Sequence, residues 1–358
     1  MKVLRICHTF PTDQIPSASI QQLYIDKYSK YKSIYFLREQ NSKLKYDLGD
    51  CKYIFKNIFD SNNLILKTLN KLFLNFKMLI FFYIYINKED IIIHAHSINY
   101  FPFLIFVSIF SKKKTYLSLG GTDLYKIINF KFIVNLLSKF NKIFVISEEF
   151  KQILNDKNIL NTVVQMNGVD HEIFYNKNLK KKNIILSVAN IRKVKGIDTL
   201  IDAFYHFNKS NKNYKLVIIG KNYNDNYFRF IKKKIFDYKI INKVILTGSL
   251  NHNSVSDYMN ESKLLVLSST SEGFPKVIIE SLSTETPVVS TNVGNVKSIL
   301  KDCGLIVNTN NPKDIKDSIE NLLLNKTVYL NCKNNCKKIF KKYTWKKVVK
   351  ILDDEYIK

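Results

Sequence analysis

Short hydrophobic runs alternate with amphipathic, helix-like segments almost throughout this chain. In the first half we expect strands at residues 3–7, 33–37, 91–94, 115–119, 143–146 and 163–166. In the second half we expect strands at residues 184–188, 215–219, 244–247, 264–267, 288–290 and 305–307. Apolar runs of this length, separated by helical patterns, are typical of buried parallel strands covered by helices. The pattern therefore predicts an α/β fold.

The chain length predicts two domains. Its 358 residues exceed the roughly 250–300 residues that a single core supports. Residues 176–182 are polar and rich in lysine, and they indicate a linker between the two series of strands. We therefore expect one Rossmann-like domain over residues 1–175 and another over residues 176–342, with a cleft between them. The tail over residues 328–358 has a helical pattern, with Thr344 as the N-cap of a helix that begins at Trp345.

The segment from Ser271 to Glu280 is the most informative part of the chain. It follows an expected strand, and we expect Pro275 to be the first residue of a helix, where its missing N–H has no cost. A helix that begins at the carboxyl end of a strand favours an anion such as a pyrophosphate. Glu272 in the loop and Glu280 in the helix would face hydroxyl groups on either side of that anion.

A second strand-to-helix loop carries Arg192 and Lys195. Because parallel strands end at the same edge of a sheet, we expect these cations to lie near Glu272, where they would neutralise a diphosphate. The alternative is that they are ordinary solvated charges. Gly220 and Gly248 end two further strands, where they either let a ligand approach the backbone or merely turn the chain.

In the first half, Gly120, Gly121 and Asp123 follow a strand. This loop can place N–H groups and a carboxylate in the predicted cleft. His94 and His96 flank the end of another strand, and we expect His94 to be satisfied by neighbouring backbone groups.

The formal net charge of +26 predicts an anionic partner. The basic residues are scattered and no helix-turn-helix, zinc-finger or RNA-stacking pattern is present, so we do not expect nucleic acid. A negatively charged bilayer is the better candidate, and the mixture of lysine and aromatic residues at 70–77 suggests where it binds. The same segment equally fits a two-sided helix packed on the first sheet.

The apolar runs are too short to cross a bilayer. The longest, residues 78–86 and 101–110, fall below the ~20 residues needed, and residues 1–7 lack the form of a signal peptide. We expect a cytoplasmic protein with peripheral contact to the inner face of the membrane. Five cysteines, an odd number, fit reduced thiols better than a disulfide framework. Cys332 and Cys336 lack nearby partner ligands, so we expect no metal there.

One ordered set of motifs resembles the retaining glycosyltransferases of family 4. The set comprises Asn167-Gly168-Val169-Asp170, Arg192…Lys195-Gly196, Glu272-Gly273-Phe274-Pro275…Glu280, Pro287-Val288-Val289 and Val293-Gly294. The resemblance is strong over roughly residues 163–325 and weaker over residues 1–147. It implies the GT-B fold, in which two Rossmann-like domains bind the acceptor and the nucleotide-sugar donor, respectively. It also implies that a C-terminal helix, about residues 343–358, returns to the first domain.

The resemblance also assigns roles to residues. Lys195 is similar to the lysine that contacts the donor diphosphate, Glu280 to the glutamate that binds the ribose hydroxyls, and Glu272 to the glutamate that holds the donor sugar. Asn190 stands at the family's usual arginine position, and Arg192 takes over that role. The implied donor site further includes Gly273, Phe274, Pro275, Lys276, Val277, Gly220 and Gly248.

The acceptor side departs from the family pattern. Residues 12–19 lack the glycines that follow the first strand in the family, and Gly120 stands where a histidine often precedes Gly-x-Asp. The implied acceptor residues here are Gly120, Gly121, Asp123 and His96.

The implied reaction moves a sugar from a UDP-, GDP- or ADP-sugar to a glycan or polyprenyl-linked acceptor, as in capsule or lipopolysaccharide synthesis. The resemblance implies retention of configuration by a front-face path, in which the donor phosphate accepts the acceptor proton. Because fixed cations and a helix N-terminus can stabilise the leaving pyrophosphate, no metal or other cofactor is expected. A nucleotide-sugar epimerase and a non-catalytic subunit that binds nucleotide or glycan remain alternatives.

Overall fold

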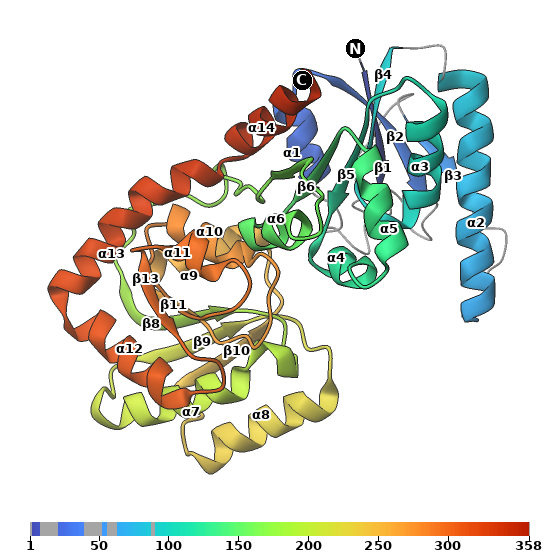
Figure 1. The fold of residues 1–358 in the computed structure, drawn as a ribbon. Helices are drawn as coiled ribbons and strands as arrows, with labels where there is room; N and C mark the ends of the chain where they lie inside the picture. The colour runs from blue at the N-terminus through green and yellow to red at the C-terminus, as the bar shows by residue number, and fades with distance from the viewer. Residues whose placement is uncertain (1, 8–20, 39–51, 56–62, 87–89, 358) are drawn as a thin grey trace. The chain divides into compact units, whose positions relative to one another are not determined.

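The computed structural model describes residues 2–7, 21–38, 52–55, 63–86 and 90–357 (Figure 1). The chain forms two compact units. Unit 1 comprises Met1–Asn167 with Trp345–Lys358, and unit 2 comprises Gly168–Thr344. The division at residue 167 lies eight residues before the predicted domain boundary at residue 175.

Unit 1 contains a parallel sheet of seven strands in the order β3-β2-β1-β4-β5-β6-β7. The strands are β1 (Lys2–Cys7), β2 (Lys32–Arg38), β3 (Lys52–Phe55), β4 (Ile91–Ala95), β5 (Thr115–Leu119), β6 (Lys142–Val145) and β7 (Thr162–Val164). Its α-helices are α1 (Gln21–Tyr28), α2 (Leu64–Phe81), α3 (Phe101–Phe110), α4 (Gly121–Ile127), α5 (Lys131–Leu136), α6 (Glu148–Asn155) and α14 (Trp345–Ile357). The sequence did not predict β3, a four-residue edge strand.

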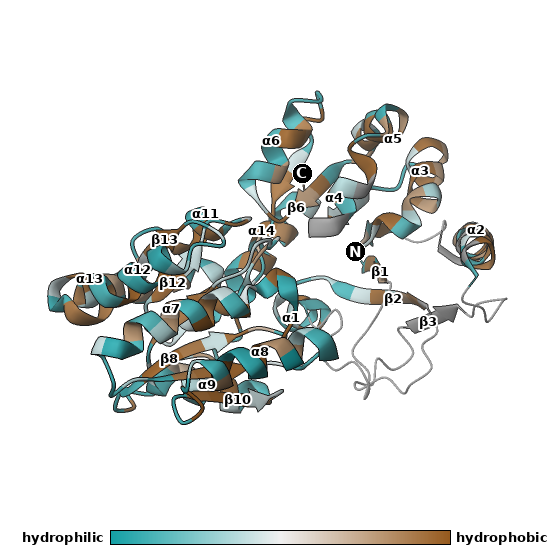
Figure 2. Cartoon of the chain, turned by 90° about the horizontal axis from the view of Figure 1, so that it is seen from below, coloured by the Kyte–Doolittle hydropathy of each residue, from teal (hydrophilic) through white to brown (hydrophobic). Residues whose placement is uncertain are grey.

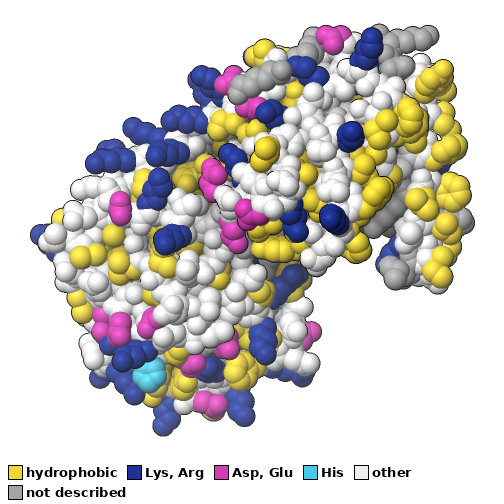
Figure 3. Space-filling model, in the orientation of Figure 1, with side chains coloured by type: hydrophobic (Ala, Val, Ile, Leu, Met, Phe, Trp, Pro, Cys, Tyr) yellow, Lys and Arg dark blue, Asp and Glu magenta, His cyan; other side chains and the backbone are white. Residues whose placement is uncertain are grey.

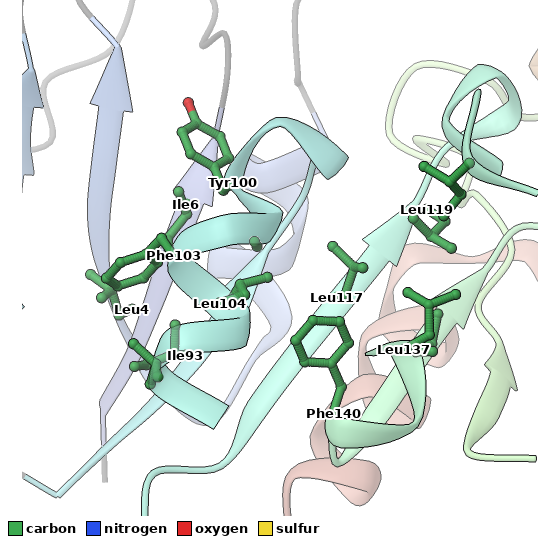
Figure 4. Close-up of a cluster of buried hydrophobic side chains, with 14 of the residues drawn as sticks. Leu4, Ile6, Ile93, Tyr100, Phe103, Leu104, Leu117, Leu119, Leu137 and Phe140 are labelled. Carbon is green, nitrogen blue, oxygen red and sulfur yellow. The ribbon is translucent and has the colours of Figure 1, made fainter. Parts of the chain in front are cut away.

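Alternate residues of the central strands pack on opposite faces of this sheet. On one face, Leu4 and Ile93 pack with Phe103 and Leu104 of α3 in the larger core (Figure 4). On the other face, the adjacent side chains Val3 and Ile92 pack with α14 through Trp345, Val348, Val349, Leu352 and Tyr356. The C-terminal helix therefore returns to the first domain, as predicted.

A buried polar network attaches α14 to the sheet. The Tyr356 hydroxyl accepts a hydrogen bond from Arg5 Nη1 at 3.1 Å and lies 2.5 Å from His94 Nδ1. The other ring nitrogen of His94 lies 2.8 Å from Ser118 Oγ. The prediction that backbone groups satisfy His94 was therefore wrong, because its partners are two side chains, one of them 262 positions away.

Unit 2 contains a parallel sheet of six strands in the order β10-β9-β8-β11-β12-β13. The strands are β8 (Lys182–Val188), β9 (Lys215–Ile219), β10 (Val244–Gly248), β11 (Ser262–Leu267), β12 (Val288–Thr291) and β13 (Gly304–Val307). Its α-helices are α7 (Ile197–Ser210), α8 (Asp225–Asp237), α9 (His252–Glu261), α10 (Lys276–Ser283), α11 (Val296–Leu300), α12 (Pro312–Leu324) and α13 (Lys326–Ile339). The strand order reverses between β8 and β11, which makes their carboxyl ends the expected ligand edge of this sheet.

One connecting segment differs from the prediction. The expected linker, residues 176–182, packs on unit 2, because Lys177 N donates to Asn260 Oδ1 of α9 and Lys177 Nζ pairs with Asp257. The tail is helical, as predicted, and consists of the two helices α13 and α14. A 3-10 turn over Phe340–Tyr343 separates α13 from α14, which begins at Trp345 directly after Thr344.

Within the described part of the chain, no helix combines the length and apolar character needed to cross a membrane. The cysteines that the structure describes, Cys7, Cys303, Cys332 and Cys336, are buried free thiols. Cys51 lies outside the described residues.

Candidate functional site

Two loops meet at the carboxyl ends of the neighbouring strands β8 and β11. The first runs from β8 through a 3-10 turn, Lys193–Lys195, to α7, and the second runs from β11 to α10. Leu186 of β8 is paired with Leu265 of β11, so both strands deliver their loops to one edge of the sheet. The sequence predicted this juxtaposition.

Gly196 allows the two loops to pack directly on each other. Its φ of 58° lies in the left-handed region, and a Cβ there would come within 2.2 Å of the Ser268 carbonyl oxygen. Ser268 Oγ donates to the Lys195 carbonyl at 2.9 Å, and Thr270 N donates to the Val194 carbonyl at 2.8 Å. The backbone positions of Lys195 and of the residues before Glu272 are therefore fixed together.

Lys195 and Glu272 form an ion pair at this junction. Lys195 Nζ lies 2.6 Å from Glu272 Oε1, and Ser269 Oγ donates to the same oxygen at 2.7 Å. The two side chains are 23% and 13% exposed. Both remain accessible enough to meet a ligand, while the salt bridge holds them in place before one arrives.

A cavity of about 340 Å³ in unit 2 adjoins the pair. This volume lies within the range of small-molecule sites, roughly 300–1,000 Å³. Nine of the residues predicted for the donor site line it, namely Asn190, Lys195, Gly220, Glu272, Phe274, Pro275, Lys276, Val277 and Glu280. The structure therefore brings most of the predicted donor residues to one cavity.

Three predicted donor residues lie outside the set of described residues that line this cavity. Arg192 is exposed and places its guanidinium 4.3 Å from the ring centroid of Tyr223, in cation–π contact. Gly273 faces the next loop, where its carbonyl accepts from Asn295 N at 3.3 Å. Gly248 ends β10, and its carbonyl accepts from Gly220 N at 2.9 Å.

Gly220 approaches a neighbouring strand rather than open space. A Cβ at this position would lie 2.0 Å from the Ala189 carbonyl oxygen, just after β8. Its lack of a side chain is therefore required by the protein's own backbone, although the residue also lines the cavity.

The helix α10 begins one residue later than predicted. Pro275 is its N-cap rather than its first residue, and the Pro275 carbonyl accepts from Ile278 N at 3.1 Å. The first turn, with Lys276 and Val277, lines the cavity. The positive end of the helix dipole and the Lys276 side chain thus both face the space where an anion would bind.

Burial changes the ionisation of the two charged residues of α10. It raises the pKa of Glu280 to about 7, opposed by the charge of Lys276. Burial also lowers the pKa of Lys276, opposed by the charge of Glu280. The Glu280 carboxyl can therefore change its charge near neutral pH.

The residues predicted for the acceptor lie at one sheet edge of unit 1. His96 follows β4, and Gly120 follows the adjacent strand β5. The His96 ring stacks on His94 with centroids 4.1 Å apart, and its Nε2 is buried with no hydrogen-bond partner within the described residues. Burial and the charge of Arg5 lower the pKa of His96, so its imidazole is neutral.

The second acceptor loop continues into a short helix. Gly120 is the N-cap of α4, and its carbonyl accepts from Asp123 N at 3.1 Å; Gly121 begins the helix. The glycine-free segment 12–19 lies outside the described residues. Across the described part of the chain, no group of three or more His, Cys, Asp or Glu side chains is arranged to hold a metal ion.

Comparison with known proteins identifies a match over unit 2. Residues 170–339 match the family described as glycosyl transferases group 1. An uncharacterized glycosyltransferase of Methanocaldococcus jannaschii is 34% identical over 215 residues, which cover 58% of this chain and 57% of that protein. A capsular polysaccharide biosynthesis glycosyltransferase of Staphylococcus aureus is 29% identical over 57% of this chain and 52% of its own length. The matched region thus spans a little over half of each of these curated relatives.

The fold of the whole chain is similar to that of solved glycosyltransferases. The Anabaena HepE structure, solved in complex with UDP, has a TM-score of 0.79 and 15% sequence identity, and the match covers 100% of both chains. The fold is therefore GT-B, as predicted.

Several lining residues were not predicted as site residues. They are Phe174, Val188, Ala189, Ile219, Ser249, Leu250, His252, Val255 and Leu267. Most of them lie at or just beyond strand ends, and this position in the sequence could have identified them as site residues. Ser269, which fixes Glu272, was also missed, although it lies in the run of hydroxyl residues 268–271 between the strand and Glu272.

Proposed function

We propose that this protein is a retaining glycosyltransferase of family 4 type. It transfers a sugar from a UDP-, GDP- or ADP-sugar to a glycan or polyprenyl-linked acceptor in the synthesis of a cell-surface polysaccharide. The observation that carries this proposal is the Lys195–Glu272 pair beside the N-terminus of α10, on one cavity. The similarity to a capsular polysaccharide glycosyltransferase and to a protein solved with UDP supports it.

Charge explains how this cavity would promote transfer. When the bond from sugar C1 to the diphosphate breaks, negative charge develops on the leaving phosphate oxygen and positive charge on the sugar ring. Lys195, Lys276 and the first-turn N–H groups of α10 would stabilise the leaving diphosphate more strongly in the transition state than in the ground state. The Glu272 carboxylate would lie beside the sugar, and Glu280 would accept hydrogen bonds from the ribose hydroxyls.

The remaining steps need no enzyme nucleophile. The acceptor hydroxyl forms its bond to C1 on the face that the diphosphate leaves, and an oxygen of the departing phosphate takes the hydroxyl proton. Configuration is thereby retained, and the protein cations supply the charge stabilisation without a metal ion. Unit 1 would bind the acceptor at the edge that carries His96, Gly120, Gly121 and Asp123, in a protein held at the inner face of the cytoplasmic membrane.

Kinetics of single variants test the proposal. We expect Lys195→Ala and Glu272→Ala each to lower kcat/KM for transfer by about 10²–10³, since each removes a charge at the reacting centre. Lys193→Ala is the matched control, because Lys193 lies in the same loop, is exposed and does not line the cavity. Transfer left intact by both cavity variants would refute the donor assignment.

Donor turnover without acceptor separates the transferase from its alternatives. A transferase consumes the nucleotide sugar in proportion to acceptor, whereas an epimerase converts the donor alone. A non-catalytic subunit would bind the nucleotide but would not turn over the donor, with or without acceptor.

A further inference from the structure

The outer face of α2 is apolar, although it does not pack on the sheet. Leu74, Met78 and Phe82, spaced four apart, are buried in the larger core of unit 1. A different stripe, consisting of Leu72, Phe76 and Ile80 of α2 and Ile84 of the π-helical turn Phe82–Ile86 that follows it, is 46–60% exposed. A surface helix of a globular protein normally turns polar residues outward. For residues 70–77 the sequence allowed two interpretations, contact with a membrane and packing on the first sheet. The two are compatible, since one stripe packs on the core and the other remains exposed.

The neighbouring helix extends this surface. α3 lies beside α2, and the two are joined by Asn75, whose Oδ1 accepts from Phe103 N at 3.1 Å. Phe106, Ile109 and Phe110 of α3 are 44%, 50% and 72% exposed, and the rings of Phe106 and Phe110 lie 4.7 Å apart. Figure 2 shows the hydrophobic colouring of α2 and α3, and Figure 3 shows hydrophobic side chains exposed over both helices. We call this surface, Leu72, Phe76, Ile80, Ile84, Phe106, Ile109 and Phe110, the apolar face of unit 1.

Positive charge accompanies the apolar face. Residues 64–142 contain eleven lysines and three acidic residues, and two of the lysines, Lys114 and Lys142, contact α14 on the other face of the sheet. Lys77 of α2, Lys112 just after α3 and Lys131 of α5 are exposed. Exposed lysines next to exposed apolar side chains are complementary to a partner that has negative charge at its surface and an apolar layer beneath it. It fits a second copy of the chain poorly, because the same excess of lysines would repel itself.

We propose that the apolar face of unit 1 docks on the surface of an anionic lipid bilayer. Phe76 and Phe110 enter the boundary between headgroups and acyl chains, and the lysines contact the headgroups. Partition of aromatic side chains and attraction to anionic lipid act together in this mode of binding. The proposal names the surface that would hold the enzyme at the membrane, and it does not depend on the transfer chemistry.

Cosedimentation with vesicles tests the proposal. We expect the full chain to bind vesicles of phosphatidylcholine that contain about a third of phosphatidylglycerol. Binding to vesicles of phosphatidylcholine alone should be much weaker, and binding to the anionic vesicles should weaken as the salt concentration is raised. Phe76→Glu and Phe110→Glu should each weaken binding by roughly tenfold or more, since each removes an apolar anchor and adds repulsion. Phe236→Glu is the matched control, because Phe236 is 67% exposed on α8 in unit 2.

A second pair of variants guards against loss of folding. Lys112→Glu and Lys131→Glu change only exposed charges and should also weaken binding, with unchanged thermal melting. Affinity for nucleotide sugar should stay the same in all four variants, so failure of this proposal is distinct from failure of the donor site. Absence of binding to anionic vesicles, or equal binding by wild type, Phe76→Glu and Phe110→Glu, would overturn it. A lipid-free dimer that Phe110→Glu dissociates would assign the face to a second copy instead.

Discussion

At the scale of single residues, the cavity places charged side chains where burial controls their ionisation. Glu280 faces the cavity from α10 with a pKa raised to about 7, and Lys276 lies one turn before it. A carboxyl in this state can meet ribose hydroxyls as a hydrogen-bond acceptor once it is ionised. The role proposed for Glu280 therefore predicts a dependence on pH.

The stability of the free protein should reflect the pKa of Glu280. Because the folded-state pKa lies above its ordinary value, the folded state retains a proton that the unfolded chain releases between about pH 4.5 and 7. The contribution of Glu280 to the free energy of unfolding is thus full below about pH 4.5 and is lost as pH rises to about 7, by about 1.4 kcal/mol per pH unit at most. We expect Glu280→Gln to flatten this part of the profile in urea unfolding from pH 5 to 8.

Nucleotide-sugar binding should show the opposite trend. Hydroxyl donors favour the ionised carboxylate, so wild-type affinity should rise as pH rises through 7, and Glu280→Gln should lose that rise. Glu261→Gln is the control, because Glu261 of α9 forms an ion pair with Lys182 of β8 away from the cavity. Identical profiles for wild type and Glu280→Gln would show that Glu280 does not titrate in this range.

At the scale of elements, the site depends on how closely the two loops at β8 and β11 approach each other. Gly196 lets the first loop contact the backbone of the second, which sets the position of Lys195 relative to Glu272. Gly248 also has a positive φ, 74°, but a Cβ there would meet nothing within 4 Å. Both glycines adopt a left-handed backbone conformation, but only Gly196 also packs closely on another loop. Comparing substitutions at the two positions therefore distinguishes the effect of close packing from the effect of backbone conformation.

We expect Gly196→Ala to be much more harmful than Gly248→Ala. Both substitutions carry the cost of a left-handed alanine, about 1 kcal/mol, and Gly196→Ala adds a clash that must move a loop. Thermal melting should show the larger loss of stability for Gly196→Ala, and nucleotide-sugar affinity should fall only in this variant. Equal losses in the two variants would mean that the approach of the loops is not required.

At the scale of the whole molecule, the strand pattern predicted most of the fold. Buried parallel strands are continuous apolar runs, so twelve of them could be located from the sequence. Because the loops after β8 and β11 carry the predicted site residues, the sequence also indicated that these two strands end at the same edge of the sheet. The strand β3 was missed, and it is a short strand of four residues at the edge of the sheet. The contact of Arg192 with Tyr223 could not be foreseen, since it depends on side-chain positions after two different strands.

The polar contacts of the first domain show the same limit. His94 was expected to bond with nearby backbone, yet it contacts Tyr356 from the last helix. Hydrophobic periodicity locates strands and helices, whereas a side-chain hydrogen bond between distant parts of the chain leaves no pattern in either segment. The motifs of unit 2 were easier to place, because loops that follow adjacent parallel strands must lie together.

The central claim is that the cavity of unit 2 binds a nucleotide diphosphate sugar through Lys195. Calorimetric titration with a panel of UDP-, GDP- and ADP-sugars tests it most directly. We predict saturable binding of one of these classes to the wild-type protein and to Lys193→Ala, and at least about tenfold weaker binding to Lys195→Ala, since a charge-assisted contact is worth about 1.5–3 kcal/mol. Failure of every nucleotide sugar to bind, or equal affinity in wild type and Lys195→Ala, would contradict it.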